Sequence, residues 1–452
     1  MVDTKTSRYS WPNSTIFLLI CILPVVSTLV FGAVDNTTWA LITIFWAAIL
    51  LLWTIESWTA GEIRFSDHAI QIPLFGFLVI GIIQLLPFGA AGEVTDALSI
   101  PASNAISIDP HSTRFFISRL AVYIIFLAGG LTFVRTKDRL RKVVILVIIF
   151  GSAMAFFGIL QRLANPEGIY GMRETPQAVP FGPFVNQHHF ASFMQMTSGL
   201  TLAFLLGATL KLDKKILLLI ALVVMSAATI LTGSRGGFIG IISVFLLVIV
   251  LHAISGRWSN PAESASLQTG RLRSVGGPIA LVCIALLVLG VVLFIGGEDS
   301  LMRGIGLSLD DPDITTGRSH FWSVALKMFL DHPFIGVGWE AFGVAFTPYD
   351  TNNGYFRVDQ AHNEYLQVLA EGGILGFACL AAFIYLLFRK SWRTIRRSSG
   401  MIREASIGAL AGCFGIMVHS VFDFPLRTPS NAFFFLLLSA IAVFPASRAG
   451  KS

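Results

Sequence analysis

Residues 135–160 read RTKDRLRKVVILVIIFGSAMAFFGIL, a cluster of basic side chains followed at once by an uncharged apolar run. At a rise of about 1.5 Å per residue, a helix from Val143 to Leu160 would come close to spanning a hydrocarbon core of about 30 Å. A buried helix of a soluble protein could have a similar composition. The fold class therefore depends on whether such runs recur along the chain.

Apolar runs of this length do recur over the whole chain of 452 residues. Hydrophobic residues make up 54% of the sequence and charged residues only 13%, against roughly 25% in an ordinary globular domain. Candidate spans begin near Thr15, Thr38, Ala69, Phe115, Val143, His189, Ile216, Gly236, Gly276, Ile374, Ala405 and Asn431. We therefore predict an all-α polytopic membrane protein, a single integral membrane domain over residues 1–452 with about twelve transmembrane helices.

The basic residues predict how the chain is oriented in the membrane. If the N-terminus is cytoplasmic, 22 of the 32 Lys and Arg residues fall on the cytoplasmic side of the twelve spans. Cytoplasmic loops of membrane proteins carry such an excess, so both termini are expected in the cytoplasm. The same rule accounts for the net charge of +6 without a nucleic-acid partner.

This orientation places the longest hydrophilic stretch, residues 297–373, on the outer side of the membrane. Of the ten outer basic residues, nine are arginine, a side chain that binds phosphate or carboxylate through two hydrogen bonds at once. The alternative is that these arginines only reach from helix ends to lipid headgroups. The outer loop is the expected functional surface.

Two helices are predicted within the outer loop. In residues 316–333 apolar side chains recur at helical spacing, and Pro333 ends the pattern; they are Trp322, Ala325, Leu326, Phe329 and Leu330. Arg318 lies at the positively polarised start of this helix, which favours an anion there unless the helix lies flat on the membrane. The second helix is predicted to begin near Asp359 and to break at Gly372 and Gly373.

Two residues near these segments are candidates for chemistry. His362 falls on an apolar stripe of the second helix, where a histidine is more often a core residue. Its outer position, however, suits an imidazole that takes a proton from a hydroxyl near neutral pH. Arg235 lies in GSRGG, residues 233–237, whose glycines would permit either close backbone approach to a ligand or a tight helix connection.

Weaker candidates are also histidines and carboxylates. His188 and His189 open a span and could be ligands or interfacial residues. His419 and Asp423 are four residues apart, the spacing at which a carboxylate can orient an imidazole. The acidic residues 310, 311 and 313 are more simply a solvated turn than a cation site, so we expect no metal and no cofactor.

Several segments taken together resemble the bacterial O-antigen ligase and O-antigen polymerase superfamily. They are FVNQHHFA (184–191), GSRGG (233–237), GRSHFW (317–322), HPFIGVGWEAFG (332–343), HNEYLQVLAEGGILG (362–376) and HSVFDFPLRTPSNAFFF (419–435). The likeness extends from about Pro180 to Phe435. It implies a GT-C-like membrane glycosyltransferase of the bacterial inner membrane, with a large, partly helical periplasmic loop at residues 297–373 that carries the active-site region.

The resemblance also implies a reaction and the roles of individual residues. Such enzymes pass a glycan from undecaprenyl diphosphate to an acceptor hydroxyl without metal or nucleotide. Arg235 and Arg318 would bind the diphosphate, and His362 would act on the acceptor hydroxyl or steady the leaving group. Other outer side chains expected to contact substrate are Asn363, Arg357, His320, His188, His189 and Arg427.

The acceptor stays open at this point. A ligase would use lipid A–core, whereas an O-antigen or exopolysaccharide polymerase would extend another lipid-linked repeat; the C-terminal segment slightly favours the polymerase. A protein O-oligosaccharyltransferase is a third alternative. A transporter or flippase for lipid-linked sugars is less favoured, because ionisable residues here lie at span ends rather than at the midplane. The expected partners are the lipid-linked donor, a glycan or glycolipid acceptor, and membrane lipid.

Overall fold

The computed structural model describes residues 10–89, 103–164, 168–176, 178–207, 210–256, 286–294, 297–304, 317–351 and 357–445. Within these ranges the helices are joined by loops, and the only sheet is two-stranded, formed by β1 (Gly168–Ile169) and β2 (Arg173–Glu174). The helices long and apolar enough to cross a membrane are α1 (Trp11–Leu29), α2 (Asn36–Ala60), α4 (Pro110–Phe133), α5 (Lys137–Ala164), α7 (Leu212–Leu231), α8 (Arg235–Gly256), α14 (Glu364–Arg397) and α15 (Gly400–His419).

This architecture agrees with the predicted all-α polytopic membrane protein. Two apolar helices, α3 (Ile72–Gln84) and α16 (Pro429–Ala442), are shorter than the eight candidate spans found in the described residues. The span expected near Gly276 falls mostly outside the described residues, of which 286–294 are helical. The number twelve therefore stays a prediction.

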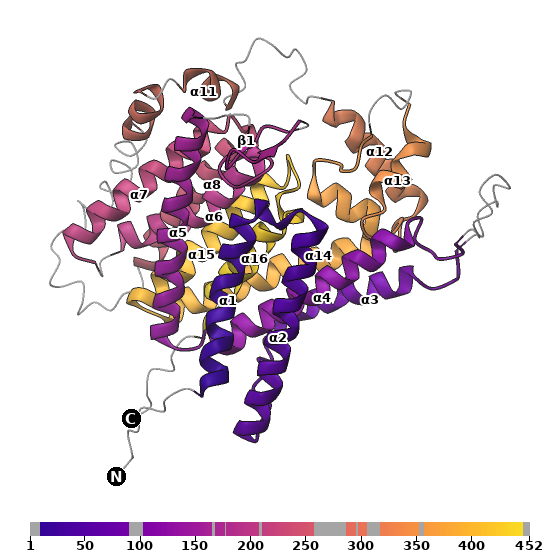
Figure 1. Ribbon diagram of the computed structural model, residues 1–452, viewed down its shortest axis with the longest axis horizontal. Helices are drawn as coiled ribbons and strands as arrows, with labels where there is room; N and C mark the ends of the chain where they lie inside the picture. The colour runs from indigo at the N-terminus through magenta and orange to yellow at the C-terminus, as the bar shows by residue number, and fades with distance from the viewer. Residues whose placement is uncertain are drawn as a thin grey trace.

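The centre of the bundle is built from α6 (Gln187–Leu206), α15 and α16, with the other helices around them (Figure 1). All of α16 is buried, as is α6 from His189 to Phe204. Glycines allow α6 and α15 to touch: a Cβ on Gly199 would lie 2.5 Å from the carbonyl oxygen of Gly408. Small residues at such crossings let helices in membranes pack closely.

Hydrogen bonds between helix ends show which loops lie together at each end of the bundle. At one end, Asn13 at the start of α1 donates to Glu56 near the end of α2, and Arg139 at the start of α5 donates to the Asn13 carbonyl. We call this the basic end, because the segments with the predicted cytoplasmic basic residues meet here. At the other end, the start of α14 bonds to the end of α15 through Glu364 N–H and the Ser420 carbonyl.

Helix α12 (Arg318–Asp331) confirms the first helix predicted in the outer loop, and it ends just before Pro333. Of the predicted apolar stripe Ala325 is buried as expected, but the rest of the buried face differs. Val324 and Met328 are buried, because they pack with α13 (Phe342–Phe346) and the start of α14, whereas Leu326 and Leu330 are exposed. In Figure 1, α12 and α13 lie together beside α3, α4 and the start of α14.

The second predicted helix begins later than expected, at Glu364 rather than near Asp359. The backbone of His362 is left-handed, with φ 51°, so a right-handed helix cannot pass through it. The Asn363 side chain then accepts the N–H groups of Tyr365 and Leu366, which makes Asn363 the N-cap. The predicted break occurs at Gly373, where φ is 60° and α14 is kinked.

Trp339 attaches the segment that contains α12 and α13 to the membrane helices. Its side chain is 1% exposed and its indole N–H donates to the carbonyl of Phe77 in α3 over 3.2 Å. The indole lies so close to the kink of α14 that a Cβ on Gly372 would come within 2.2 Å of it. These contacts set the direction in which α14 begins, and therefore the position of His362.

We expect Trp339→Ala to lower the free energy of unfolding by about 3–5 kcal/mol, because it empties a large buried volume and removes the bond to Phe77. Thermal unfolding of the purified protein in detergent micelles would measure the loss. Phe334→Ala is the control, since that ring is 71% exposed. Equal effects of the two changes would contradict the structural role of Trp339.

Candidate functional site

His362 and Asp423 form a hydrogen-bonded pair at the end of the bundle opposite the basic end. The distance from His362 Nδ1 to Asp423 Oδ1 is 3.2 Å, and the side chains are 32% and 2% exposed. Asp423 lies in the turn between α15 and α16, 61 positions from His362 along the chain. The carboxylate is thus buried behind an imidazole that remains accessible, an arrangement in which an acidic group can orient a base.

The charge state of Asp423 is set by this pair. Burial opposes its ionisation, but the hydrogen bond from His362 and the nearby imidazoles outweigh burial and hold the pKa of the carboxyl well below its usual value. Its Oδ1 also accepts the N–H of Phe424, whereas Oδ2 is buried and has no hydrogen-bond partner among the described residues. Asp423 is therefore a carboxylate that can keep a proton on Nδ1 of His362.

Two aromatic rings hold the imidazole of His362 in place. Phe321 of α12 stacks on it with ring centroids 6.2 Å apart, and Phe424 meets it edge to face at 4.8 Å. With Nδ1 engaged by Asp423, the second ring nitrogen, Nε2, is the one left for a ligand.

Arg318 belongs to the same site, since it begins α12 three residues before Phe321, on the same side of the helix. Burial lowers the pKa of the Arg318 guanidinium, the Asp423 carboxylate acts in the opposite direction, and the like charge of Arg235 lowers it further. Two guanidiniums near enough to repel one another are stabilised by an anion between them. The structure thus brings together the three predicted catalytic residues, His362, Arg318 and Arg235.

Arg235 is the first residue of α8, after a three-residue turn from α7. Ser234 caps the helix by accepting the N–H of Gly237. A Cβ on Gly236 would lie 2.6 Å from the His419 ring, and one on Gly237 would lie 2.8 Å from Ala191. Of the two explanations for GSRGG, the tight helix connection is therefore the one supported by these contacts.

The two histidines that open α6 have different surroundings. His188 is partly exposed, and the charges of Asp423, Arg318, His362 and Arg303 all act on it, so it lies within the same cluster. His189 is buried, hydrogen-bonded to Thr428 Oγ1 over 2.6 Å and in edge contact with Phe424. His189 therefore supports the turn that carries Asp423, whereas His188 is partly exposed and lies within reach of the charges of the site.

Three other candidates have side chains that bond elsewhere than to the His362–Asp423 pair. Asn363 is 8% exposed and its side chain caps α14, as described above. His320 pairs with Asp350 through Nε2 at 2.9 Å, and Arg357 is 83% exposed and pairs with its neighbour Asp359. These contacts give each residue a structural partner within the protein.

Arg427 is buried behind the site in an ion-pair network. Its Nη2 lies 2.8 Å from Glu371, which is fully buried, and its Nε lies 3.5 Å from Glu364 at the start of α14. Burial alone would lower the pKa of Arg427, but Glu371, Glu364 and Glu340 raise it above its usual value. The charge of Arg427 is balanced within the protein, which favours a structural role in holding α14 to the Asp423 turn.

We expect Arg427→Met to destabilise the protein by about 3–5 kcal/mol, because the Glu371 carboxylate would remain buried without its cation. Unfolding of purified protein in mixed micelles would measure this. Adding Glu371→Gln in the same chain should recover part of the loss, and Arg357→Met should change little. An unaltered stability of Arg427→Met would show that the pair is not structural.

One predicted pairing was wrong, that between His419 and Asp423. Helix α15 ends at His419, so helical spacing does not extend to Asp423, and each of the two side chains is hydrogen-bonded to a different residue. His419 is 1% exposed and bonds through Nδ1 to Ser192 of α6, while Asp423 bonds to His362. The sequence indicated Asp423 only as a partner of His419, and its spacing within HSVFDFPLR gave no sign of the bond to His362.

Among the described residues no group of three or more His, Cys, Asp or Glu side chains is arranged to hold a metal ion. The acidic residues 310, 311 and 313 lie outside the described residues. The site that the structure defines is thus an imidazole–carboxylate pair beside two arginines.

Taken together, the bundle of membrane-crossing helices and the polar cluster at one end define a multi-pass membrane protein with a one-sided site. Residues 220–381 match the sequence model of a protein family described as O-antigen ligase. This match supports the predicted relationship of the chain to the O-antigen ligase and polymerase superfamily. More generally, it supports a membrane glycosyltransferase of that type. The matched residues include Arg235, Arg318 and His362, whereas Asp423 lies beyond them. A search of curated proteins found no significant match.

Proposed function

We propose that this protein transfers a glycan from an undecaprenyl-diphosphate donor to a hydroxyl of a glycan or glycolipid acceptor, on the periplasmic face of the bacterial inner membrane. The observation that carries the proposal is the His362–Asp423 pair beside Arg318 and Arg235. A base and an anion-binding pair are the two elements that such a transfer requires.

In this mechanism His362 Nε2 takes the proton of the acceptor hydroxyl. The hydroxyl oxygen then forms a bond to the anomeric carbon of the donor sugar, and the bond from that carbon to the diphosphate oxygen breaks. Undecaprenyl diphosphate leaves with the electron pair. Asp423 holds the Nδ1 proton of His362, so that Nε2 has its lone pair toward the acceptor, and it stabilises the imidazolium that forms.

Arg318 and Arg235 would stabilise the charge that develops on the departing diphosphate. Their mutual repulsion is relieved when an anion binds between them, and it is relieved further as negative charge accumulates during bond cleavage. The proton shift and the charge stabilisation can both be performed by side chains of the chain itself. The donor's lipid tail would remain in the bilayer, which agrees with a site at the end of membrane helices.

Two acceptors fit this chemistry, lipid A–core for a ligase and a second lipid-linked repeat for a polymerase. The placement of ionisable groups at the ends of the spans argues against a lipid-linked sugar transporter, which would need polar residues at the midplane. Protein glycosylation has no separate observation in its favour.

Deletion of the gene followed by glycan analysis tests the proposal and assigns the acceptor. Loss of a polymerase should leave single repeats on the lipid carrier, and loss of a ligase should leave full-length polymer there. Re-expression of the wild-type protein should restore the product in either case. An unchanged glycan profile in a strain that normally expresses the protein would contradict the proposal.

A further inference from the structure

The exposed side of α12 changes character along the length of the helix. Ser319 and Ser323 are exposed in its first half, whereas Leu326 and Leu330, which continue the same side of the helix, are 46% and 64% exposed. The opposite side is fixed inside the protein, where Val324 packs with α13 and the start of α14. A helix that lay wholly in water would expose polar side chains over its whole length, so the second half of α12 requires an apolar environment.

The apolar part of this side continues into a membrane-crossing helix. Phe334, which follows α12, is 71% exposed, and its carbonyl accepts the N–H of Leu375 over 3.2 Å. Leu375 and its neighbour Ile374 are 48% and 45% exposed just after the kink of α14, a helix long and apolar enough to span a membrane. The exposed apolar end of α12 is therefore joined to the surface that α14 presents to lipid.

The exposed side of α14 shows how far this lipid-facing surface extends toward the basic end. Its exposed side chains are uncharged until Arg389; they are Ile374, Leu375, Ala378, Ala381, Ala382 and Tyr385. The guanidinium of Arg389 lies 5.8 Å from the Tyr385 ring, so charge reaches that level from the basic end. The fifteen positions from Ile374 to Arg389 cover about 22 Å, less than a hydrocarbon core of about 30 Å. The rest of the core lies beyond Ile374, where Phe334 and the end of α12 are.

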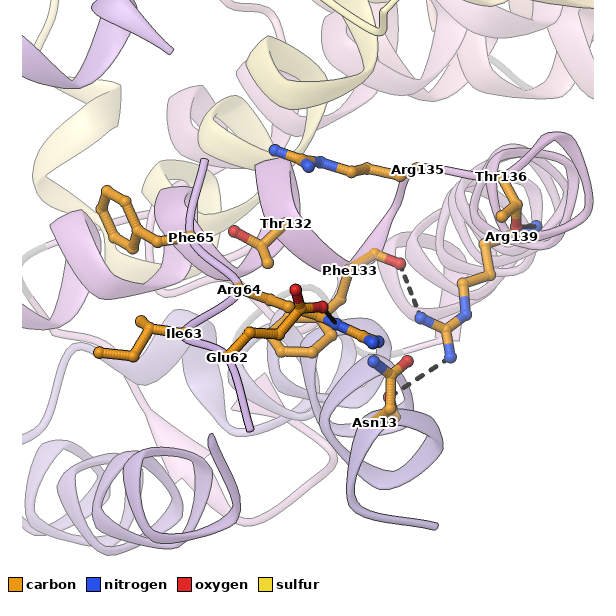
Figure 2. Close-up of a pocket in the computed structure, with 10 residues that line it drawn as sticks. All are labelled: Asn13, Glu62, Ile63, Arg64, Phe65, Thr132, Phe133, Arg135, Thr136 and Arg139. Carbon is orange, nitrogen blue, oxygen red and sulfur yellow. Dashed lines mark hydrogen bonds and ion pairs between the residues drawn. The ribbon is translucent and has the colours of Figure 1, made fainter. Parts of the chain in front are cut away.

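The basic end of the bundle has exposed apolar side chains of the same kind. Trp58, near the end of α2, is 86% exposed, and Ile63 and Phe65 on the following loop are 83% and 50% exposed. Figure 2 shows Ile63 directed away from Asn13 and Arg139, which line a pocket at this end. Aromatic side chains exposed at the ends of spans lie at the level of the lipid headgroups. At the other end of the bundle, α12 carries the corresponding side chains.

Polar side chains at the same end of α12 limit how deeply it can lie in the membrane. Lys327, Asp331 and His332 are exposed on either side of Leu330, and the Asp331 carboxylate accepts the hydroxyl of Tyr349 over 2.7 Å. Charged groups remain among the headgroups, which a lysine can reach with its long side chain. The end of α12 therefore fits the boundary between headgroups and acyl chains.

We propose that α12 is inclined to the membrane, with its C-terminal end against the acyl chains of the leaflet at this end of the bundle and its N-terminal end in water. Leu330 and Phe334 contact the acyl chains, and Lys327 lies among the headgroups. Arg318 begins the helix about 18 Å from Leu330 along the axis, so it lies at or above the headgroups. This placement does not depend on the transferase function.

Spin labels on single cysteines test the inclination, with the full chain in liposomes and its four native cysteines replaced by alanine. The variants are Leu326→Cys and Leu330→Cys, with Ser323→Cys as the matched control in water and Leu375→Cys as the reference for lipid contact. Oxygen, an apolar molecule, concentrates among acyl chains, whereas a nickel chelate stays in water. The ratio of collisions with oxygen to collisions with the chelate should rise from Ser323 to Leu326. It should be severalfold higher at Leu330 than at Ser323 and close to the value at Leu375.

A second measurement uses the unaltered chain, so it does not depend on the folding of any variant. A phospholipid with a diazirine in its acyl chain, activated by light in the same liposomes, should label the segment from Leu326 to Phe334. Ser319 and Ser323 should stay unlabelled. Labelling of the two serines alone would contradict the proposed direction of the inclination.

Three results with the spin labels would overturn the proposal. If the label at Leu330 meets the chelate as often as the one at Ser323, this side of α12 lies in water. Few collisions of the Leu330 label with either molecule would show that another protein surface covers it. An equal preference for oxygen at Ser323, Leu326 and Leu330 would show that α12 lies flat on the membrane.

Discussion

Replacing His362 with alanine is expected to lower the rate of glycan transfer by about 10²–10⁴-fold, the usual contribution of a positioned general base. The side chain is 32% exposed and has its hydrogen bond at Nδ1, so the change removes the accessible Nε2 from the site. The measurement is the transfer rate from a lipid-linked donor with purified protein in nanodiscs, supported by the glycan profile of cells that carry the variant.

His332→Ala is the control for this change, because His332 is an exposed histidine at the end of α12 in the same loop. It should retain nearly full activity. If well-folded His362→Ala protein transfers glycan at the wild-type rate, His362 is not the base.

Asp423→Asn separates the positioning role from the base itself. The amide keeps the shape of the carboxylate but cannot stabilise an imidazolium, so kcat should fall while KM changes little. A rise in KM at constant kcat would instead place Asp423 in contact with substrate.

Replacing Arg318 with glutamine should reduce transfer by about 10²–10³-fold, because an anion-stabilising donor acts most strongly as charge develops on the leaving group. Arg235→Gln should have a similar effect, since the two guanidiniums lie within electrostatic reach of one another. Arg318→Lys should restore only part of the activity, because an ammonium cannot bind the diphosphate through two parallel hydrogen bonds. The transfer rates of the three variants measure these effects.

Arg357→Gln provides the comparison, as Arg357 is 83% exposed and pairs only with its neighbour Asp359 in the described contacts. Its activity should match the wild type. If it loses as much activity as Arg318→Gln, a general attraction between the loop and anionic substrate would explain both, and the specific diphosphate site would be contradicted.

Much of the helical structure was predictable because local rules determine it. Apolar runs predicted the spans of α1, α2, α5 and α15, and Pro333 and Gly373 mark the end of α12 and the kink of α14. The start of α14 was not predictable from periodicity. The left-handed backbone at His362 and the cap at Asn363 override an otherwise continuous helical pattern.

The site was only partly predictable. His362, Arg318 and Arg235 could be selected as outer residues with suitable chemistry, and the structure brings these three together. The partner of His362 could not be selected, because Asp423 is 61 positions away and had an apparent local partner in His419. Arg427 had the same features in the sequence as the others, an arginine on the predicted outer side near a helix end, yet in the fold it is ion-paired with Glu371 and Glu364.

The sequence by itself determined that this is an all-α membrane protein with its basic segments grouped at one end. The length of each apolar run and the position of the basic residues beside it are local properties, and they determine how a segment inserts into the bilayer. Tertiary structure alone decided which imidazole meets which carboxylate and which arginine is balanced inside the protein. Those pairings depend on how α12, α14 and the turn between α15 and α16 pack against one another. Close packing between segments that are distant in the chain produces no repeating pattern in the sequence from which it could be predicted.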